Sequence, residues 1–286
     1  MKTIIVTGAN AGIGKACSRQ LAQQGHRVIM ACRNQQRGEA ARQEIVSETG
    51  NGEVVLKIVD LSSLRSLKNF VQEVTKNYDC IDVLINNGAD FDISRKVKIM
   101  TDDGLESQFA TNVVAPFFLS LSLLPMLEKS PAGKIINISS KGLIMYPFIK
   151  LNIDDFNCDK KYNPATQYYQ NKLALLMTSI YMNENLKSKT KIAAIRVTNV
   201  KVDVNRYPNL TDFQKKLYNF KSKFSISAEE MAQSYVSLVN DDDFAGFYVD
   251  EKLREVKIDK GAFDKEKQII LVDYLQKITG LQISKF

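Results

Sequence analysis

The stretch "YYQNK" at 168–172 places two adjacent tyrosines and a lysine within about one turn of a helix. Tyr168 precedes Lys172 by four residues and Tyr169 precedes it by three, and both spacings bring side chains to one helix face. An ammonium group beside a phenol favours the phenolate, so it lowers the tyrosine pKa from about 10 and allows proton exchange near neutral pH. The same spacing is common in surface packing. Spacing alone leaves open whether this stretch does chemistry, and which tyrosine would act.

A single histidine, His26, limits the chemistry available to the chain. It follows Gly25 in what we expect to be an exposed turn between a helix and a strand, and a Ser-His-Asp triad would depend on it alone. Sites with several histidine ligands are excluded, and we expect no metal. Any proton transfer must use Tyr, Lys, Asp, Glu or Cys side chains.

The composition is that of a globular protein, with 44% hydrophobic and 25% charged residues. The net charge of +7 comes from scattered lysines and arginines that do not interleave with aromatics, which argues against a nucleic-acid partner. No C-x-x-C joins the four cysteines, which suggests free thiols in a reducing compartment: Cys17, Cys32, Cys80 and Cys158. No apolar run approaches the roughly 18 residues of a membrane span, and "MKTIIVTGAN" enters a strand at once. We therefore expect a cytoplasmic protein without signal peptide or anchor.

Short apolar, β-branched runs alternate with helical patterns along the whole chain. We expect strands at 3–7, 27–32, 54–60, 81–86, 134–139, 191–197 and 246–249. We expect helices at 15–24, 34–49, 62–78, 101–127, 164–186 and from 227 onward, with N-caps at Asn34 and Ser227 and a bend at Pro116. This alternation predicts an α/β fold, a parallel sheet with helices on both faces, in a single domain over residues 1–286. Ligands of such sheets bind beyond the carboxyl ends of the strands.

The turn "TGANAGIG" at 7–14 joins the first strand to the first helix with the glycine pattern G-x-x-x-G-x-G. Glycine permits a tight turn and a close approach of backbone to phosphate, and a helix N-terminus favours the anion. Such a stretch can also be only a turn, but its strand–turn–helix context favours a dinucleotide. The predicted cofactor-binding residues are Gly8, Asn10, Gly12, Ile13 and Gly14, with Leu61, Asn87 and Gly88 after later strands.

The second strand ends in "ACRN", without the Asp or Glu that binds the ribose 2′-hydroxyl in many NAD sites. Arg33 follows instead, and its guanidinium suits a 2′-phosphate, with Lys15 as a second cation. The alternative is that Arg33 is a solvated loop residue. Asp60, after the third strand, could accept a hydrogen bond from the adenine amino group or could cap the next helix. Together these residues favour NADP(H) over NAD(H) as the cofactor.

The order and spacing of several motifs resemble the short-chain dehydrogenase/reductase family over nearly the whole chain. These motifs are "TGANAGIG", "DLSSL" at 60–64, "INNGA" at 85–89, Asn112, "NISS" at 137–140 and "YYQNK". The segments "ACRN", "TDDGLESQFATN" and "SAEEMAQS" are similar to its retinol-dehydrogenase-like branch. The resemblance implies a Rossmann-type doubly wound sheet, a nicotinamide cofactor and a Ser-Tyr-Lys triad with a supporting Asn. It makes Tyr168 the proton donor or acceptor and Lys172 its partner, places Ser140 on the substrate oxygen, and gives Asn112 a water in the proton relay.

Two departures from the family pattern bear on the cofactor. Gly88 and Ala89 are reversed relative to the usual Ala-Gly, which moves the conformational freedom of the glycine by one residue. Val197 and Thr198 replace the usual Pro-Gly after the sixth strand, and Val202 stands where a threonine would contact the nicotinamide half. Thr198 or Asn199 could compensate for these changes.

Two functional hypotheses follow. The leading one is an NADP(H)-dependent oxidoreductase that acts on a carbonyl/alcohol pair, with the aromatic-rich segment at about 200–226 as a lid over an apolar aldehyde or ketone. A helix packed on the core is an equal alternative for that segment. The resemblance also admits a homo-oligomer, because family members often dimerise or tetramerise. The second hypothesis is a protein of the same fold that binds NADP(H) with little or no turnover, as a sensor or interaction module, and the altered segment 197–202 motivates it.

Overall fold

The structure is a computed structural model that describes residues 1–92, 94–146, 148–201 and 225–283. Within these ranges, seven strands form one parallel sheet in the order β3-β2-β1-β4-β5-β6-β7. The strands are β1 Thr3–Thr7, β2 Arg27–Cys32, β3 Val54–Ile58, β4 Val83–Asn86, β5 Lys134–Ser140, β6 Lys191–Val197 and β7 Tyr248–Val249. The chain runs outward from β1 to β3 and then returns to place β4 on the other side of β1, so the strand order reverses there. The predicted doubly wound parallel sheet is confirmed.

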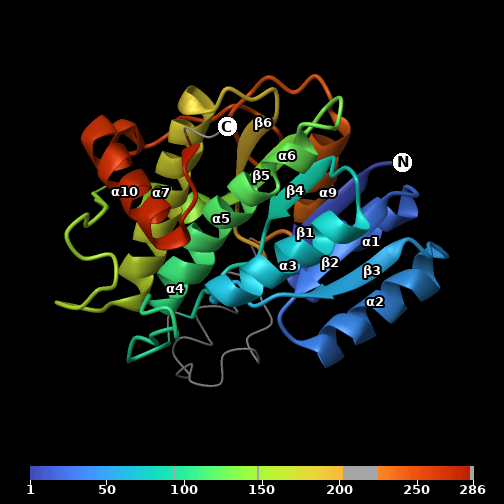
Figure 1. Cartoon of the computed structure of the whole chain (residues 1–286), viewed down its shortest axis with the longest axis horizontal. Helices are drawn as coiled ribbons and strands as arrows, with labels where there is room; N and C mark the ends of the chain where they lie inside the picture. Colours follow the sequence, from blue (N-terminus) through green and yellow to red (C-terminus); the bar gives the residue numbers. More distant parts are fainter. Residues whose placement is uncertain (93, 147, 202–224, 284–286) are drawn as a thin grey trace.

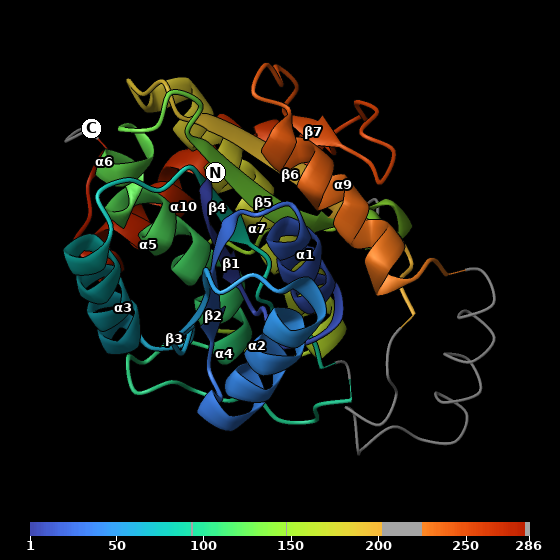
Figure 2. The ribbon, with the colours of Figure 1, turned by 90° about the vertical axis from the view of Figure 1, so that its right-hand side faces the viewer.

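Helices cover both faces of the sheet (Figures 1 and 2). One layer holds α1 Gly12–Gln23, α2 Gln35–Thr49 and α9 Ala228–Asn240. The other holds α3 Leu64–Asn77, α5 Ala115–Ser122, α7 Pro164–Asn185 and α10 Lys265–Thr279, with the short helices α4 Ser107–Phe109 and α6 Leu124–Leu127 before and after α5. In the part of the chain that the structure describes, no helix has the length and apolar character needed to cross a membrane.

The central strand β1 shows how the two layers are filled. All five of its residues are buried, as expected for a strand covered on both sides. Ile4 and Val6 pack in the cluster beneath α1 and α9, whereas Ile5 packs in the cluster beneath α3, α5 and α7. The period of two therefore divides an unbroken apolar run between two cores.

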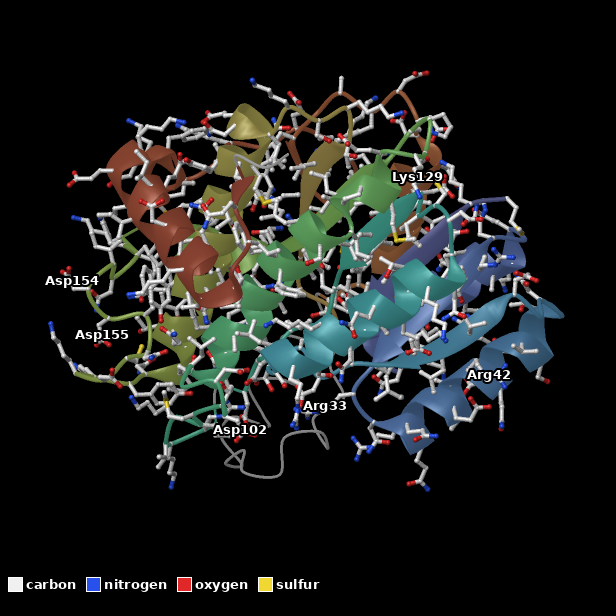
Figure 3. The ribbon with its side chains drawn as sticks, in the orientation of Figure 1. Arg33, Arg42, Asp102, Lys129, Asp154 and Asp155 are labelled. Carbon is white, nitrogen blue, oxygen red and sulfur yellow. The ribbon has the colours of Figure 1, made fainter. Side chains whose placement is uncertain are left out.

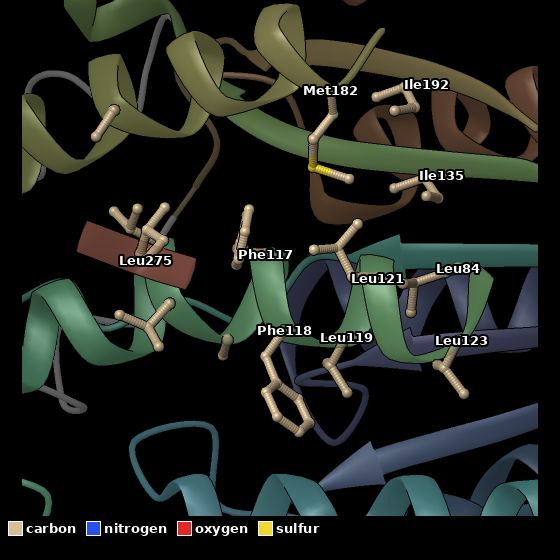
Figure 4. Close-up of a cluster of buried hydrophobic side chains, with 14 of the residues drawn as sticks. Leu84, Phe117, Phe118, Leu119, Leu121, Leu123, Ile135, Met182, Ile192 and Leu275 are labelled. Carbon is tan, nitrogen blue, oxygen red and sulfur yellow. The ribbon is translucent and has the colours of Figure 1, made fainter. Parts of the chain in front are cut away.

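Helix α5 lies in the interior of the larger of these clusters. Figure 4 shows Phe117 and Leu121 of this helix directed toward Met182 of α7 and Ile135 of β5, with Leu275 of α10 nearby. All five side chains are at most 5% exposed. The packing joins α5, which follows Asn112, and α7, which carries Tyr168 and Lys172, in one buried cluster.

The carboxyl ends of the strands lie at one edge of the molecule. Arg33, directly after β2, and Asp102, between β4 and β5, lie at this edge, and Lys129, just before β5, lies at the opposite one (Figure 3). His26, which was predicted to be exposed, is half-buried just before the start of β2, and its Nδ1 accepts a hydrogen bond from the backbone N–H of Lys2 at 3.2 Å. The histidine is therefore far from the edge where ligands of such sheets bind.

The predicted helix caps are present. Asn34 caps α2 by accepting a hydrogen bond from the backbone N–H of Arg37 at 2.8 Å. Ser227 and Glu230 form a reciprocal capping box at the start of α9. These local interactions fix the first turn of each helix and can be read from the sequence because their partners are three residues apart.

The helix predicted at 101–127 begins later and is broken. Thr101 and Gly104 form a turn in which Gly104 has φ +72°, and Glu106 caps α4 by accepting from the N–H of Phe109. A π-helical turn at Ala110–Val114 (η1) then precedes α5. Pro116 lacks the N–H that an α-helix would use four residues earlier, and a wider turn accommodates this loss.

Three helical elements of the described residues were not predicted from the sequence. They are a 3₁₀ helix at Lys141–Met145 (η2) at the start of the long loop after β5, a second 3₁₀ helix at Lys260–Phe263 (η4), and α10. Helix α10 begins with charged residues but buries Leu271, Val272 and Leu275 against the core that α7 also contacts. Its stability comes from this long-range packing more than from helix propensity.

Candidate functional site

A cleft of about 1320 Å³ lies beyond the carboxyl ends of the strands. It exceeds the roughly 300–1,000 Å³ of typical small-ligand pockets, so it has room for a dinucleotide and a second molecule. The cleft is lined by most of the predicted site residues, namely Gly8, Asn10, Gly12, Ile13, Gly14, Arg33, Asp60, Leu61, Asn87, Gly88, Ser140 and Tyr168. The side chains of Asn112 and Lys172 are buried, with 1% and 3% exposure. Asn112 bonds to Asp90, which lines the cleft, and Lys172 bonds to Ile138 of β5.

The glycine turn brings backbone against backbone. Gly8 and Gly12 have φ of +66° and +55°, and a Cβ on Gly14 would lie 2.5 Å from the carbonyl oxygen of Gly8. Helix α1 begins at Gly12, and Ala11 provides no side-chain cap for its first amides. These amides and the positive end of the helix dipole therefore border the cleft, as a pyrophosphate site requires.

The reversed pair after β4 packs on the same turn. The N–H of Gly88 donates to Thr7 Oγ1 at 2.8 Å, and Asn87 Nδ2 donates to the Thr7 carbonyl at 2.8 Å. A Cβ on Gly88 would lie 2.5 Å from Leu61 Cδ1 and 3.3 Å from the Gly8 nitrogen. A glycine at this position therefore allows the loop after β4 to approach the glycine turn and Leu61 closely.

Two arginines lie at the end of the cleft next to β2. Arg33 and Arg37 both line it, and Arg37 stands in the first turn of α2 because Asn34 caps that helix. Lys15, predicted as the second cation, forms a 2.5 Å ion pair with Glu44. Arg37 was not predicted as a site residue. Its position three residues after the cap Asn34 could have indicated that it lies in the first turn of α2, near the cleft.

Asp60 lines the cleft and folds its own loop. Its Oδ1 accepts hydrogen bonds from the backbone N–H of Ser62 at 2.9 Å and from Ser62 Oγ at 2.7 Å. The cap of α3 is Ser63, which accepts from the N–H of Ser66 at 3.3 Å. Of the two roles considered for Asp60, capping of the helix is therefore wrong, and a contact with the adenine stays a prediction.

Helix α7 carries the tyrosine–lysine pair and begins at the cap residue Asn163. Lys172 Nζ donates to the carbonyl of Ile138 at 2.7 Å and lies 5.6 Å from the centre of the Tyr168 ring. Burial lowers the pKa of Lys172 to about 8, so the side chain is mostly charged at neutral pH. The Tyr168 ring packs at 4.4 Å from that of Phe91, at the wall of the cleft.

The neighbouring tyrosine has a different environment. Burial, and then the proximity of Tyr146, raises the pKa of Tyr169 above its ordinary value. Its ring stacks on Tyr146 with centres 4.2 Å apart and meets the edge of the Tyr168 ring at 5.3 Å. A raised pKa is unsuited to proton exchange near neutral pH, so the geometry favours Tyr168 as the acid–base group.

Ser140 ends β5 and faces the cleft. Its Oγ accepts a hydrogen bond from the N–H of Gly142 at 3.1 Å. A hydroxyl has one proton to donate, and an Oγ that already accepts from a backbone amide is free to aim that proton elsewhere. The serine can therefore donate to a developing oxyanion in the cleft.

Both the oxygen and the nitrogen of the Asn112 side chain bond to the loop after β4. Its Oδ1 accepts from the N–H of Asp90 and its Nδ2 donates to the carbonyl of the same residue, both at 2.9 Å. Asn112 lies in the π-helical turn, and the residue four positions on is Pro116, which has no N–H for the Asn112 carbonyl. The group suited to hold a water is thus the backbone carbonyl, while the amide positions Asp90.

The altered segment after β6 is described only in part. Val197 and Thr198 line the cleft, and the Thr198 hydroxyl accepts a hydrogen bond from Lys141 Nζ at 3.3 Å. Val200 and Ile226 pair in a short bridge at the cleft. Val202 and most of the predicted lid at about 200–226 lie outside the described residues.

Comparison with known proteins relates this chain to dehydrogenases. Residues 2–150 match the model of the short chain dehydrogenase family. Retinol dehydrogenase 14 of Homo sapiens is 31% identical over 260 residues, which cover 86% of this chain and 76% of that protein.

Solved structures share the fold at lower identity. A crystal structure of an uncharacterized protein from Mycobacterium paratuberculosis matches with a TM-score of 0.73 and 24% identity, over 99% of this chain and 95% of that one. The alcohol dehydrogenase of Thermococcus sibiricus, complexed with 5-hydroxy-NADP, matches with a TM-score of 0.65 and 17% identity, over 90% of this chain and 100% of that one.

Proposed function

Since the chain belongs to the short-chain dehydrogenase/reductase family, in its retinol-dehydrogenase-like branch, and is an oxidoreductase of that family, we propose that it transfers a hydride between NADP(H) and a carbonyl/alcohol pair. One observation carries the proposal. Tyr168 and Ser140 line the same cleft as the glycine turn, with the Lys172 ammonium 5.6 Å from the Tyr168 ring. The residues that we propose as acid–base group, oxyanion donor and phosphate cradle therefore line one cleft.

The preference for NADP(H) rests on charge at the ribose end of the cleft. Arg33 and Arg37 could both contact a 2′-phosphate, and "ACRN" has no carboxylate to bind a 2′-hydroxyl. The NADP analogue in the Thermococcus sibiricus enzyme is in keeping with this choice for the shared fold. The glycine turn fits the pyrophosphate, because added Cβ atoms would fill the space it needs.

In the direction of reduction, bound NADPH would supply the hydride that the carbonyl carbon accepts. Tyr168 would give its phenolic proton to the carbonyl oxygen, and Ser140 would donate a hydrogen bond to the same oxygen as negative charge develops. The buried Lys172 ammonium would stabilise the resulting phenolate. A water on the Asn112 carbonyl would relay a proton from the solvent back to the Tyr168 phenolate.

The substrate we propose is an apolar aldehyde or ketone. Four aromatic rings line the cleft in contact with one another, which are those of Phe91, Tyr168, Tyr169 and Tyr146. Such a wall favours flat or apolar groups beside the reacting carbonyl. The names of the relatives agree with this class, and the segment at about 200–226 remains our proposal for a lid.

A second candidate is a protein of this fold that binds NADP(H) with little or no turnover. The observation in its favour is the segment after β6, where Val197 and Thr198 stand in place of a rigid Pro-Gly. Poor orientation of the nicotinamide would slow hydride transfer strongly while leaving binding intact.

Binding and turnover assays separate the two candidates. NADPH and NADH are titrated by fluorescence, and NADPH consumption is followed with p-nitrobenzaldehyde, all-trans-retinal, phenanthrenequinone and hexanal. We expect tighter binding of NADPH, turnover of at least one carbonyl, and a loss of about 10²–10⁴-fold in kcat for Tyr168→Phe. Tight binding without turnover, and no effect of Tyr168→Phe, would favour the second candidate.

A further inference from the structure

Helix α7 contacts the chain on both sides of Ser140, in β5 before the serine and in η2 after it. Lys172 Nζ donates to the carbonyl of Ile138, two residues before the serine. Tyr169, three residues earlier on the same helix face, lies against Gly142, two residues after the serine. We infer that Tyr169 is a positioning residue, which acts through Gly142 to hold the Ser140 hydroxyl in its reactive orientation.

A side chain at Gly142 would require the Tyr169 ring to shift. A Cβ on Gly142 would lie 2.4 Å from Cε1, 2.6 Å from Oη and 2.8 Å from Cζ of Tyr169, and real Cβ contacts essentially never fall below 3.0 Å. Tyr146 stacks on the Tyr169 ring at 4.2 Å and the Tyr168 ring meets it at 5.3 Å, so a shift of the ring would disturb both of these contacts.

The same glycine orients the serine. The N–H of Gly142 donates to Ser140 Oγ at 3.1 Å, so the position of this amide decides which lone pair is occupied and where the hydroxyl proton can go. Ser140 and Gly142 both line the cleft. A displacement of about 1 Å of this amide turns the hydroxyl away from the substrate oxygen, and misplacement of that size can cost about 10²-fold in rate.

Two other roles for Tyr169 make different predictions. A second acid–base group would need a pKa near neutrality, whereas burial raises that of Tyr169. If Tyr169 only formed part of the pocket wall, its substitution would affect substrate entry whether or not Ser140 has its hydroxyl. Positioning of the hydroxyl, in contrast, matters only while that hydroxyl is present.

The inference rests on the proposed function, because that proposal gives Ser140 its role. The experiment therefore combines Gly142→Ala, Tyr169→Ala and their double variant with either Ser140 or Ser140→Ala. Turnover is measured with the best carbonyl of the four-member panel, together with the NADPH Kd. We expect Gly142→Ala to lower kcat about 10²-fold, and the double variant to be no worse than Tyr169→Ala, because removal of the ring makes room for the methyl group.

The decisive comparison is made without the serine hydroxyl. In the Ser140→Ala background, we expect Gly142→Ala to change kcat less than about twofold, with an unaltered NADPH Kd. Tyr169→Phe, which keeps the ring over the glycine, should retain about fivefold more kcat than Tyr169→Ala. If Gly142→Ala is poorly folded, this second pair tests the inference on its own.

The contact itself is tested by thermal unfolding. Overpacking should lower the Tm of Gly142→Ala by about 3–8 °C, and Tyr169→Ala should restore part of that loss in the double variant. A full effect of Gly142→Ala in the Ser140→Ala background would overturn the inference, as would equal kcat for Tyr169→Phe and Tyr169→Ala. Absence of turnover in the unsubstituted protein, or no effect of Ser140→Ala, would instead overturn the proposed function on which it rests.

Discussion

The buried lysine of α7 should make stability depend on pH. The Lys172 side chain is 3% exposed, and burial lowers its pKa from 10.5 to about 8. That difference corresponds to about 3 kcal/mol between the two protonation states. Below pH 8 the lysine is charged in both the folded and the unfolded chain, whereas between about 8 and 10.5 only the unfolded chain keeps the proton. The contribution of Lys172 to the free energy of unfolding should therefore rise with pH across this window, by at most about 3 kcal/mol.

The perturbation is Lys172→Met, which removes the titrating group and keeps a long side chain. Urea unfolding between about pH 7 and pH 10 should show a free energy that rises more steeply in the unsubstituted protein than in the variant. The kcat of the variant should fall about 10²–10⁴-fold, because no ammonium then supports the Tyr168 phenolate.

Lys134 provides a matched control at the opposite end of β5. It is buried, its Nζ donates to the carbonyls of Leu238 and Asp241, and burial followed by repulsion from Lys2 lowers its pKa to about 8. Lys134→Met should therefore flatten the stability profile and leave kcat unchanged.

Two outcomes would count against this reasoning. Parallel unfolding profiles of the unsubstituted protein and Lys172→Met across the window would refute the lowered pKa of Lys172. An equal loss of kcat in Lys134→Met would show that the loss in Lys172→Met reports destabilisation and not chemistry.

Three further predictions concern the cofactor half of the cleft. Arg33→Ala and Arg37→Ala should each raise the Kd for NADPH about tenfold and leave that for NADH within about twofold, as measured by fluorescence titration; equal effects on both cofactors would contradict a 2′-phosphate contact. Gly14→Ala should weaken NADPH binding at least tenfold in the same assay, because its Cβ would lie 2.5 Å from the Gly8 carbonyl oxygen, and unaltered binding would show that the turn can relax. Asn34→Ala should lower the free energy of urea unfolding by about 1 kcal/mol through loss of the α2 cap, with no change if water replaces the side chain.

The fold was predictable from the sequence wherever its determinants are local. The apolar runs at 3–7 and 27–32 became β1 and β2 at the predicted bounds, and the caps Asn34 and Ser227 formed with partners three residues away. Helix α10 was missed because its buried residues acquire meaning only through their contact with the core beneath α7. The break before α5 was only partly foreseen, since Pro116 predicted a bend but not the π-helical turn.

The site was predictable where side chains share a turn or a motif, and less so where they meet across elements. Residues of the glycine turn line the cleft together because they are neighbours in the chain. Lys15 was predicted as the second cation, but it forms an ion pair with Glu44, and Arg37 lines the cleft with Arg33. This ion pair joins α1 to α2, so the residue spacing within either helix does not predict it. The engagement of the Asn112 amide by the Asp90 backbone likewise depends on where the loop after β4 returns to the sheet.

The two tyrosines of "YYQNK" show what the third dimension adds. Both stand at a helical distance from Lys172, so helix geometry treats them as equivalent partners. The tertiary structure removes this equivalence, because Gly142 of η2 lies against Tyr169, while the Lys172 ammonium lies 5.6 Å from the Tyr168 ring. All three residues, Tyr168, Tyr169 and Ser140, line the cleft, but burial raises the pKa of Tyr169 and so favours a packing role for it. On this reasoning the adjacent tyrosines are not redundant. Tyr169 should not replace the acid–base group in Tyr168→Phe, and Tyr168 should not replace the packing contact in Tyr169→Ala.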